Sequence, residues 1–143
     1  MTKENEVLFE KTIEVRWSDC DANRHMRHSA YADFCAHTRV AFLSDLGMTP
    51  EWFEQQKLGP ILFQEEPQYR REVHMGESLR VTVEAGEATG FTKSIQILQH
   101  LYKPSGELAA VLRCVVAWMD LEQRKVIGLP ESILQRFPVQ LED

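Results

Sequence analysis

Residues 29–47, SAYADFCAHTRVAFLSDLG, predict one long helix around which the rest of the chain can be arranged. Ser29 is suited to the N-cap, and Gly47 is suited to the position just beyond the C-terminal end. Between them, apolar side chains cover most of the circumference, and polar residues such as Asp33 and His37 leave only a narrow stripe for water. We therefore expect this helix to be enclosed by the fold.

Strands are expected on both sides of this helix in the sequence. Alternating or continuous apolar patterns mark five stretches: 7–17, 61–73, 79–85, 91–102 and 108–119. Pro67 favours an edge position for its strand, because proline cannot donate a ladder hydrogen bond. The last stretch, LAAVLRCVVAWM, is almost entirely apolar and predicts the central, most buried strand.

The connections between the later strands are only a few residues long, which permits hairpins and excludes parallel crossovers. Short helical segments are expected at 50–57 and 131–137. The fold class is therefore α+β, with a five-stranded antiparallel sheet wrapped around one long helix. A chain of 143 residues fits one domain, which we take to be residues 1–143.

Composition narrows the classes of partner. The chain has 16 basic and 22 acidic residues, a formal charge of -6, so it lacks the basic footprint of a nucleic-acid-binding protein. Its three scattered cysteines favour a reducing compartment. The charged first residues do not resemble a signal peptide, and no apolar run reaches the roughly 18 residues that would cross a bilayer. We expect a cytoplasmic protein with no nucleic-acid or membrane partner.

The loop before the helix carries a more specific signal. Residues 16–31, RWSDCDANRHMRHSAY, resemble the signature of the 4-hydroxybenzoyl-CoA thioesterase family, an aromatic-x-Asp-x-Asp motif followed by a tyrosine. The order of expected elements agrees over about residues 7–120. The resemblance implies the hotdog fold and the hydrolysis of an acyl-CoA or acyl-carrier-protein thioester. It also implies a homodimer or homotetramer with active sites at the subunit interface, and no cofactor or metal.

The resemblance also implies roles for particular residues. The catalytic carboxylate of the family falls on Asp21, and its oxyanion donor, a backbone amide at the helix start, falls near His28 and Ser29. A histidine that some bacterial acyl-CoA members have seven positions after the carboxylate matches His28. The residues alone support the same chemistry, because a carboxylate can attack a thioester or deprotonate water, and helix N-terminal amides can stabilise an oxyanion.

The same segment departs from the family at two positions. Arg24 stands where the family commonly has glycine, so the loop is expected either to take a different shape or to make its turn at Asn23. His25 matches a histidine of some branches, but Arg27 replaces the asparagine that accompanies it there. We assign His25, with Asn23 and Ser29, to substrate or oxyanion binding, although Asn23 and Ser29 also suit a purely backbone role.

Other interpretations stay open at the level of sequence. Asp21 has an ordinary alternative role as a turn or cap residue, and Asp19 suits a structural pairing with Arg16. A metal site built from Asp19, Asp21, His25 and His28 is an alternative whose spacing matches no known ligand motif. A hydratase or dehydratase on the same fold, or a non-catalytic acyl-thioester-binding module, competes with a thioesterase.

Overall fold

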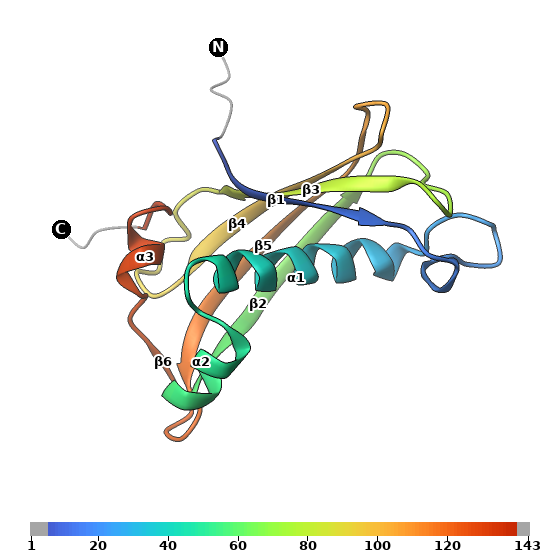
Figure 1. The fold of residues 1–143 in the computed structure, drawn as a ribbon. Helices are drawn as coiled ribbons and strands as arrows, with labels where there is room; N and C mark the ends of the chain where they lie inside the picture. Colours follow the sequence, from blue (N-terminus) through green and yellow to red (C-terminus); the bar gives the residue numbers. More distant parts are fainter. Residues whose placement is uncertain (1–5, 140–143) are drawn as a thin grey trace, which may run out of the picture.

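The long helix α1 (His28–Asp45) lies along the inner side of a curved antiparallel sheet (Figure 1). The structure is a computed structural model that describes residues 6–139. The strands of the sheet are β1 (Val7–Glu14), β2 (Leu58–Tyr69), β3 (Ser78–Ala85), β4 (Ile95–Tyr102), β5 (Leu108–Asp120) and β6 (Lys125–Ile127). The smaller helical elements are the 3-10 turn η1 (Trp17–Asp19), α2 (Pro50–Gln56) and α3 (Glu131–Leu134).

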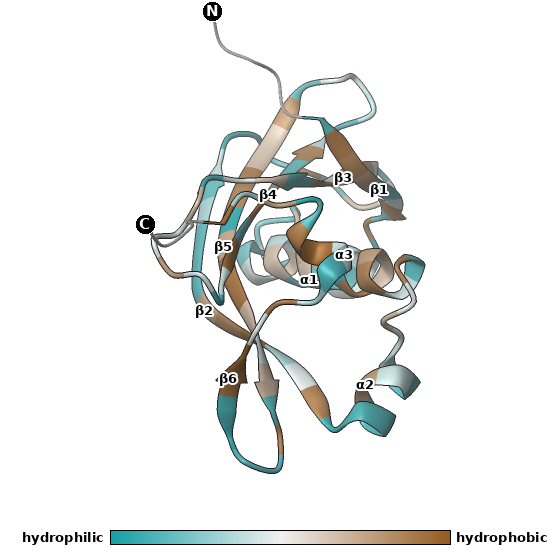
Figure 2. Ribbon diagram, turned by 90° about the vertical axis from the view of Figure 1, so that its left-hand side faces the viewer, coloured by the Kyte–Doolittle hydropathy of each residue, from teal (hydrophilic) through white to brown (hydrophobic). Residues whose placement is uncertain are grey.

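The strand order explains why α1 is enclosed. The order is β1-β3-β4-β5-β2, with the short β6 paired to β5. Because β1 and β2 occupy opposite edges, the chain between them must cross the whole sheet, and α1 makes most of that crossing. Figure 2 looks along α1 and shows the strands from β2 to β1 curving around it. The predicted α+β arrangement of a sheet around one helix is therefore present, and the short β6 adds a sixth strand to the five that were predicted.

The core lies between α1 and the inner face of the sheet. One side of α1 is buried through Ala30, Tyr31, Phe34, Cys35, Thr38, Phe42 and Leu43. The strands contribute alternate residues, which include Leu79, Val81, Val83, Ile95, Ile97, Leu101, Leu112, Val116 and Trp118. This burial of alternating positions is what the period of two in the sequence predicted. Together these residues fix where the two ends of α1 can lie relative to the sheet.

Several predicted strand limits and positions were wrong. The strand predicted at 7–17 ends at Glu14, and Trp17 is 81% exposed because the chain turns into η1 there. The edge strand expected from 61 begins at Leu58 and ends at Tyr69, although Pro67 does lie in an edge strand. The run 108–119 is interior and largely buried, but β4 occupies the middle of the order.

The predicted helix ends agree with the structure at some positions and differ at others. Ser29 is not the N-cap of α1; Arg27 holds that position, and Ser29 lies inside the first turn. Gly47 follows the C-terminal end with φ +91°, a conformation that glycine adopts without strain, so its predicted role is confirmed. The segment predicted at 50–57 forms α2, whose Thr49 side chain accepts the Trp52 amide.

Among the helices of residues 6–139, none is long and apolar enough to pass through a lipid bilayer.

Candidate active site

The loop between β1 and α1 contains a tight turn over residues 21–25, and Asp21 lies at the start of this turn. Cys20 and Met26 form an isolated antiparallel bridge, and the Asp21 amide donates to the His25 carbonyl at 3.0 Å. Arg24 takes φ +68° inside this turn, so the position where the family commonly has glycine keeps a left-handed conformation. The expectation that Asn23 would replace it in this role was wrong, since Asn23 is not among the residues with positive φ in the described part of the chain.

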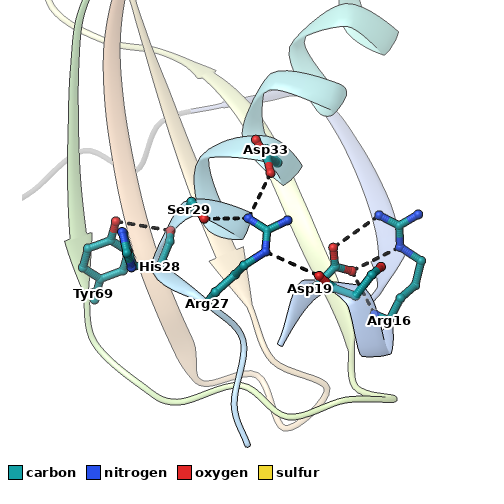
Figure 3. A network of polar contacts seen from close by, with 8 residues as sticks. Arg16, Asp19, Arg27, His28, Ser29, Asp33 and Tyr69 are labelled. Atoms are coloured by element: carbon teal, nitrogen blue, oxygen red, sulfur yellow. Dashed lines mark hydrogen bonds and ion pairs between the residues drawn. The ribbon is translucent and has the colours of Figure 1, made fainter. Parts of the chain in front are cut away.

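Asp19 anchors the first half of this loop, as predicted. Its carboxylate is buried and accepts the Arg16 amide at 2.9 Å and the Arg16 guanidinium at 3.2 Å (Figure 3). Burial alone would raise the pKa of Asp19, but the hydrogen bonds from Arg16 and the charges of Arg16 and Arg27 outweigh burial and hold this pKa below its ordinary value. The ionised Asp19 therefore stabilises the folded loop.

This pairing predicts a specific loss of stability in acid. A depressed carboxylate pKa contributes stability above its unfolded value of about 3.9, and the contribution is lost as the pH falls through the lower folded value. Arg16 is largely exposed, so we expect Asp19→Asn to lower the free energy of unfolding by only about 1–2 kcal/mol at neutral pH. Urea denaturation at a series of pH values should show a shallower acid dependence in the variant; parallel profiles would contradict this assignment.

Arg27 ties the same loop to the first turn of α1. Its amide donates to the Asp19 carbonyl at 2.8 Å, and its guanidinium contacts the Ser29 hydroxyl at 2.6 Å and the Asp33 carboxylate at 3.4 Å (Figure 3). The Ser18 carbonyl also accepts from this guanidinium at 3.4 Å. Arg27 thus connects the loop to α1, while Arg24 forms the left-handed residue of the turn.

The Asp21 carboxylate has one oxygen in the turn and one near a histidine. Its Oδ1 accepts the Asn23 amide at 2.9 Å, which is the turn role considered as the ordinary alternative. Its Oδ2 lies 3.7 Å from His25 Nδ1, a contact longer than a hydrogen bond. The side chain is 33% exposed, so it is held in place by the loop and still accessible. The bond that Asp21 makes in the turn therefore leaves its side chain accessible.

Asp21 borders a cavity of about 370 Å³ at the N-terminal end of α1. The cavity is lined by Asp21, His25, Met26, His28, Tyr31, Tyr69, Arg70, Arg71 and Glu72. Three of the predicted site residues, Asp21, His25 and His28, thus share one cavity. Asn23 and Ser29 do not line it. The Asn23 amide donates to Asp21 within the turn, and the Ser29 hydroxyl accepts from Arg27 at the start of α1.

The first turn of α1 presents two backbone amides beside the cavity. No acceptor within residues 6–139 is hydrogen-bonded to the backbone amides of His28 and Ser29. These amides belong to the positive end of the α1 dipole, where an anion is stabilised. The Tyr69 hydroxyl donates to the His28 carbonyl at 3.4 Å and so links this turn to the end of β2 (Figure 3). A carboxylate and unpaired helix amides therefore lie at one end of the same helix.

The two tyrosines of the cavity were not predicted as site residues. Tyr31 is buried, its hydroxyl donates to the Arg71 carbonyl at 3.2 Å, and its ring meets that of Tyr69 edge-on at 5.1 Å between centroids. Burial and nearby charged or acidic groups raise the pKa of Tyr31, so it stays a neutral donor. Tyr31 follows the same apolar pattern as the other buried residues of α1, and Tyr69 carries no local signal, because only the packing of β2 beside α1 brings it to the cavity.

Basic residues lie at the rim of the cavity. Arg70 and Arg71 line the cavity, and both also line an adjoining groove with Glu107 and Leu108. Arg71 pairs with Glu107 at 3.4 Å, and Arg70 donates to Gln68 at 3.2 Å. Two other basic residues, Lys93 and Arg113, line neither the cavity nor the groove.

The metal interpretation finds no geometric support. Asp19 is committed to Arg16 and does not line the cavity of Asp21. In the described part of the chain, no three His, Cys, Asp or Glu side chains gather as a metal site would require.

The three cysteines are unpaired, and burial raises the pKa of Cys35 to about 12, so that residue is an inert thiol. The cytoplasmic location stays a prediction.

Solved structures with the same architecture are numerous. PA2801 from Pseudomonas aeruginosa, a candidate thioesterase, is 24% identical with a TM-score of 0.80, covering 90% of this chain and 96% of that one. SAV2348 from Staphylococcus aureus, solved in complex with CoA, is 18% identical with a TM-score of 0.80, covering 100% and 93%. Slr0204, a 1,4-dihydroxy-2-naphthoyl-CoA thioesterase from Synechocystis, is 17% identical with a TM-score of 0.77, covering 86% and 90%. No curated protein matches the sequence.

The sheet, the enclosed helix and these likenesses define the chain as a hotdog-fold domain, which confirms the predicted fold. The model of the thioesterase-like superfamily matches residues 15–137, and the chain belongs to that superfamily.

Proposed function

We propose that the chain hydrolyses acyl thioesters of coenzyme A at the Asp21 cavity. The observation that carries this proposal is the position of one accessible carboxylate and two unpaired helix amides at the same end of α1. Membership of the thioesterase-like superfamily supports thioester hydrolysis in general. No cofactor or metal is required, because the carboxylate and the amides supply both of the functions that the reaction needs.

In the proposed reaction, the thioester carbonyl oxygen accepts hydrogen bonds from the His28 and Ser29 amides. Asp21 then takes a proton from water, whose oxygen bonds to the carbonyl carbon, or attacks that carbon directly. The oxyanion collapses, the carbon–sulfur bond breaks, and the thiolate leaves and takes up a proton, which protonated Asp21 supplies in the first route. In the second route an acyl anhydride of Asp21 remains, and water hydrolyses it to the free acid and restores the carboxylate. His25 and His28, which line the same cavity, would orient the substrate or the water.

Coenzyme A rather than a carrier protein is proposed as the carrier because of charge at the rim. Arg70 and Arg71 place two guanidinium groups beside the cavity, and arginine binds phosphate groups well. The neighbour SAV2348 was solved with CoA, which shows that a protein of this fold can hold that carrier. A free-thiol release assay over a panel of acyl-CoAs tests the activity; no release from any thioester would contradict the proposal.

The active assembly is proposed to be a homodimer or homotetramer formed through the edge of β2. β2 is twelve residues long and ends the strand order, so its outer edge has no partner strand among residues 6–139. It also carries exposed apolar side chains, Leu62, Phe63 and Tyr69. Long apolar edge strands commonly pair with another chain. Pairing at this edge would also enclose the Asp21 cavity, because Tyr69 and Arg70 lie at the end of β2.

A lysine at this edge should break the assembly. We expect the unaltered protein to elute as a dimer or larger and Phe63→Lys to shift it toward the monomer, because the new charge would be buried at the interface. Size-exclusion chromatography with light scattering measures the change. Phe91→Lys is the matched control, since Phe91 is similarly exposed but lies in the turn before β4. A monomeric unaltered protein with full activity would contradict the proposed assembly.

A further inference from the structure

A second cavity, here called the α1–β2 cavity, lies between the C-terminal half of α1 and the start of β2. Its volume is about 150 Å³, and its lining consists of Ala36, Arg39, Val40, Phe42, Leu43, Pro60, Ile61, Leu62, Ile95, Ile97, Val116, Trp118 and Ile133. Every lining side chain except those of Arg39 and Trp118 is a hydrocarbon. An apolar cavity of about this volume accepts a benzene-sized group, so a six-carbon ring or a chain end fits it.

The two polar side chains of this cavity are both hydrogen-bond donors with capacity to spare. Trp118 is 1% exposed, and its Nε1 has no acceptor within the described residues. A buried donor without an acceptor is costly to the fold and is uncommon in native proteins. The lining contains no side-chain acceptor that could satisfy it. Because Nε1 itself is buried beneath the cavity surface, an oxygen acceptor of a ligand would satisfy it once the indole turns toward the cavity.

Arg39 is held rigidly at the wall of the same cavity. Gln99 is fully buried and its Nε2 donates to the Cys35 carbonyl at 3.1 Å, which fixes the amide so that Oε1 accepts from Arg39 at 2.9 Å. Only one of the five guanidinium N–H donors is used in this bond. Arg39 therefore has a fixed position and unused donors.

No counter-ion neutralises Arg39 among residues 6–139. It makes no ion pair with any described carboxylate, including Glu65, whose charge acts on the neighbouring Cys35. The nearby thiols Cys35 and Cys114 have pKa values raised by burial, so they are uncharged. A half-buried cation beside an apolar cavity is stabilised by an acceptor in the ligand.

We propose that the α1–β2 cavity receives the distal part of the acyl group, and that Arg39 and Trp118 select acyl groups with an apolar body and an oxygen acceptor near the far end. This inference rests on the proposed thioesterase function and adds a substrate class to it. The Asp21 cavity and the α1–β2 cavity adjoin opposite ends of both α1 and β2. Antiparallel pairing of β2 with its own copy would bring the Asp21 cavity of one subunit close to the α1–β2 cavity of the other, so an acyl group held at Asp21 would extend into the partner subunit's α1–β2 cavity.

The test compares matched acyl-CoAs, from hexanoyl to dodecanoyl, that end in a methyl or a hydroxyl group. For the best-fitting length we expect the unaltered protein to prefer the hydroxyl-ended substrate by about tenfold in kcat/KM, the effect of a hydrogen bond to a charged donor. Arg39→Met should abolish or reverse this preference, and Trp118→Phe should reduce it. Lys93→Met is the control for loss of one positive charge, since Lys93 is exposed and lines neither cavity.

Binding measurements separate this inference from the proposed activity. Non-hydrolysable S-alkyl-CoA thioethers with methyl or hydroxyl ends can be compared by calorimetry, without turnover. If no thioester is cleaved but the hydroxyl-ended thioether binds more tightly and Arg39→Met removes the difference, the proposed activity fails and this inference stands. If Arg39→Met does not fold, Trp118→Phe decides. A preference for the methyl end at every length, an unchanged preference in the folded variants, or no binding of either thioether would overturn the inference.

Discussion

Asp21→Asn is expected to lower kcat/KM for the best acyl-CoA by about 10³-fold, because a neutral amide can neither accept a proton from water nor attack the thioester. The substitution keeps the loop intact. Asparagine retains a side-chain oxygen that can accept the Asn23 amide, now 2.9 Å from Asp21 Oδ1. The loss should therefore be a loss of chemistry and not of structure. Release of free thiol measures it, with circular dichroism to check the fold.

A control substitution at another carboxylate of the chain tests whether the loss in Asp21→Asn is specific to the site. Asp45→Asn removes an exposed carboxylate at the other end of α1 and should leave turnover unchanged. If Asp21→Asn kept turnover close to that of the unaltered protein, the only role of Asp21 would be the turn that its Oδ1 makes. Equal losses in the two variants would point to net charge and not to the site.

Phe42→Ala is expected to have the largest effect on stability. Phe42 is buried on the inner side of α1, and its ring packs against Phe9 of β1 at 5.9 Å and against Phe137 at 6.1 Å between centroids. It therefore joins three segments that are far apart in sequence. Truncation should leave a cavity and lower the free energy of unfolding by about 3–5 kcal/mol, measured by urea denaturation.

The exposed Phe91 provides the control for this loss. Its side chain is half exposed in the turn before β4, so Phe91→Ala should change the free energy of unfolding by no more than about 0.5 kcal/mol. A small loss in Phe42→Ala, close to that of Phe91→Ala, would mean that the end of α1 can repack. It would contradict the account of a helix held tightly between β1 and the C-terminal segment.

The main elements of the fold were predictable from the sequence because their patterns are local. The alternation in 79–85 reflects burial that the structure confirms, and the helix predicted at 29–46 is present but buried on one side only, with apolar Val40 half exposed. The limits of the elements were less predictable. Trp17 continues the alternation of β1, yet it lies outside the strand, because the Arg16–Asp19 pair closes η1 there. Pairing across the sheet, and not local pattern, extends β2 back to Leu58.

In the candidate site, too, the residues close together in sequence were predictable and those brought together by packing were not. Asp21, His25 and His28 lie in one loop and one helix turn, and their closeness in the sequence accounts for their sharing a cavity. Ser29 suited the N-cap by residue type, but Arg27 takes that position because its amide bonds the Asp19 carbonyl. Tyr69 reaches the cavity from a strand forty residues away, and only the placement of β2 against α1 brings it there.

The central claim is that the Asp21 carboxylate and the first amides of α1 act on the same thioester carbonyl. The most direct measurement is a crystal structure with a non-hydrolysable acyl-CoA analogue in which a methylene ketone replaces the thioester. The account predicts that the ketone oxygen accepts from the backbone amides of His28 or Ser29, while Asp21 Oδ2 faces the carbonyl carbon directly or through one water. A ketone bound away from the start of α1, or an Asp21 side chain directed into bulk solvent, would contradict it.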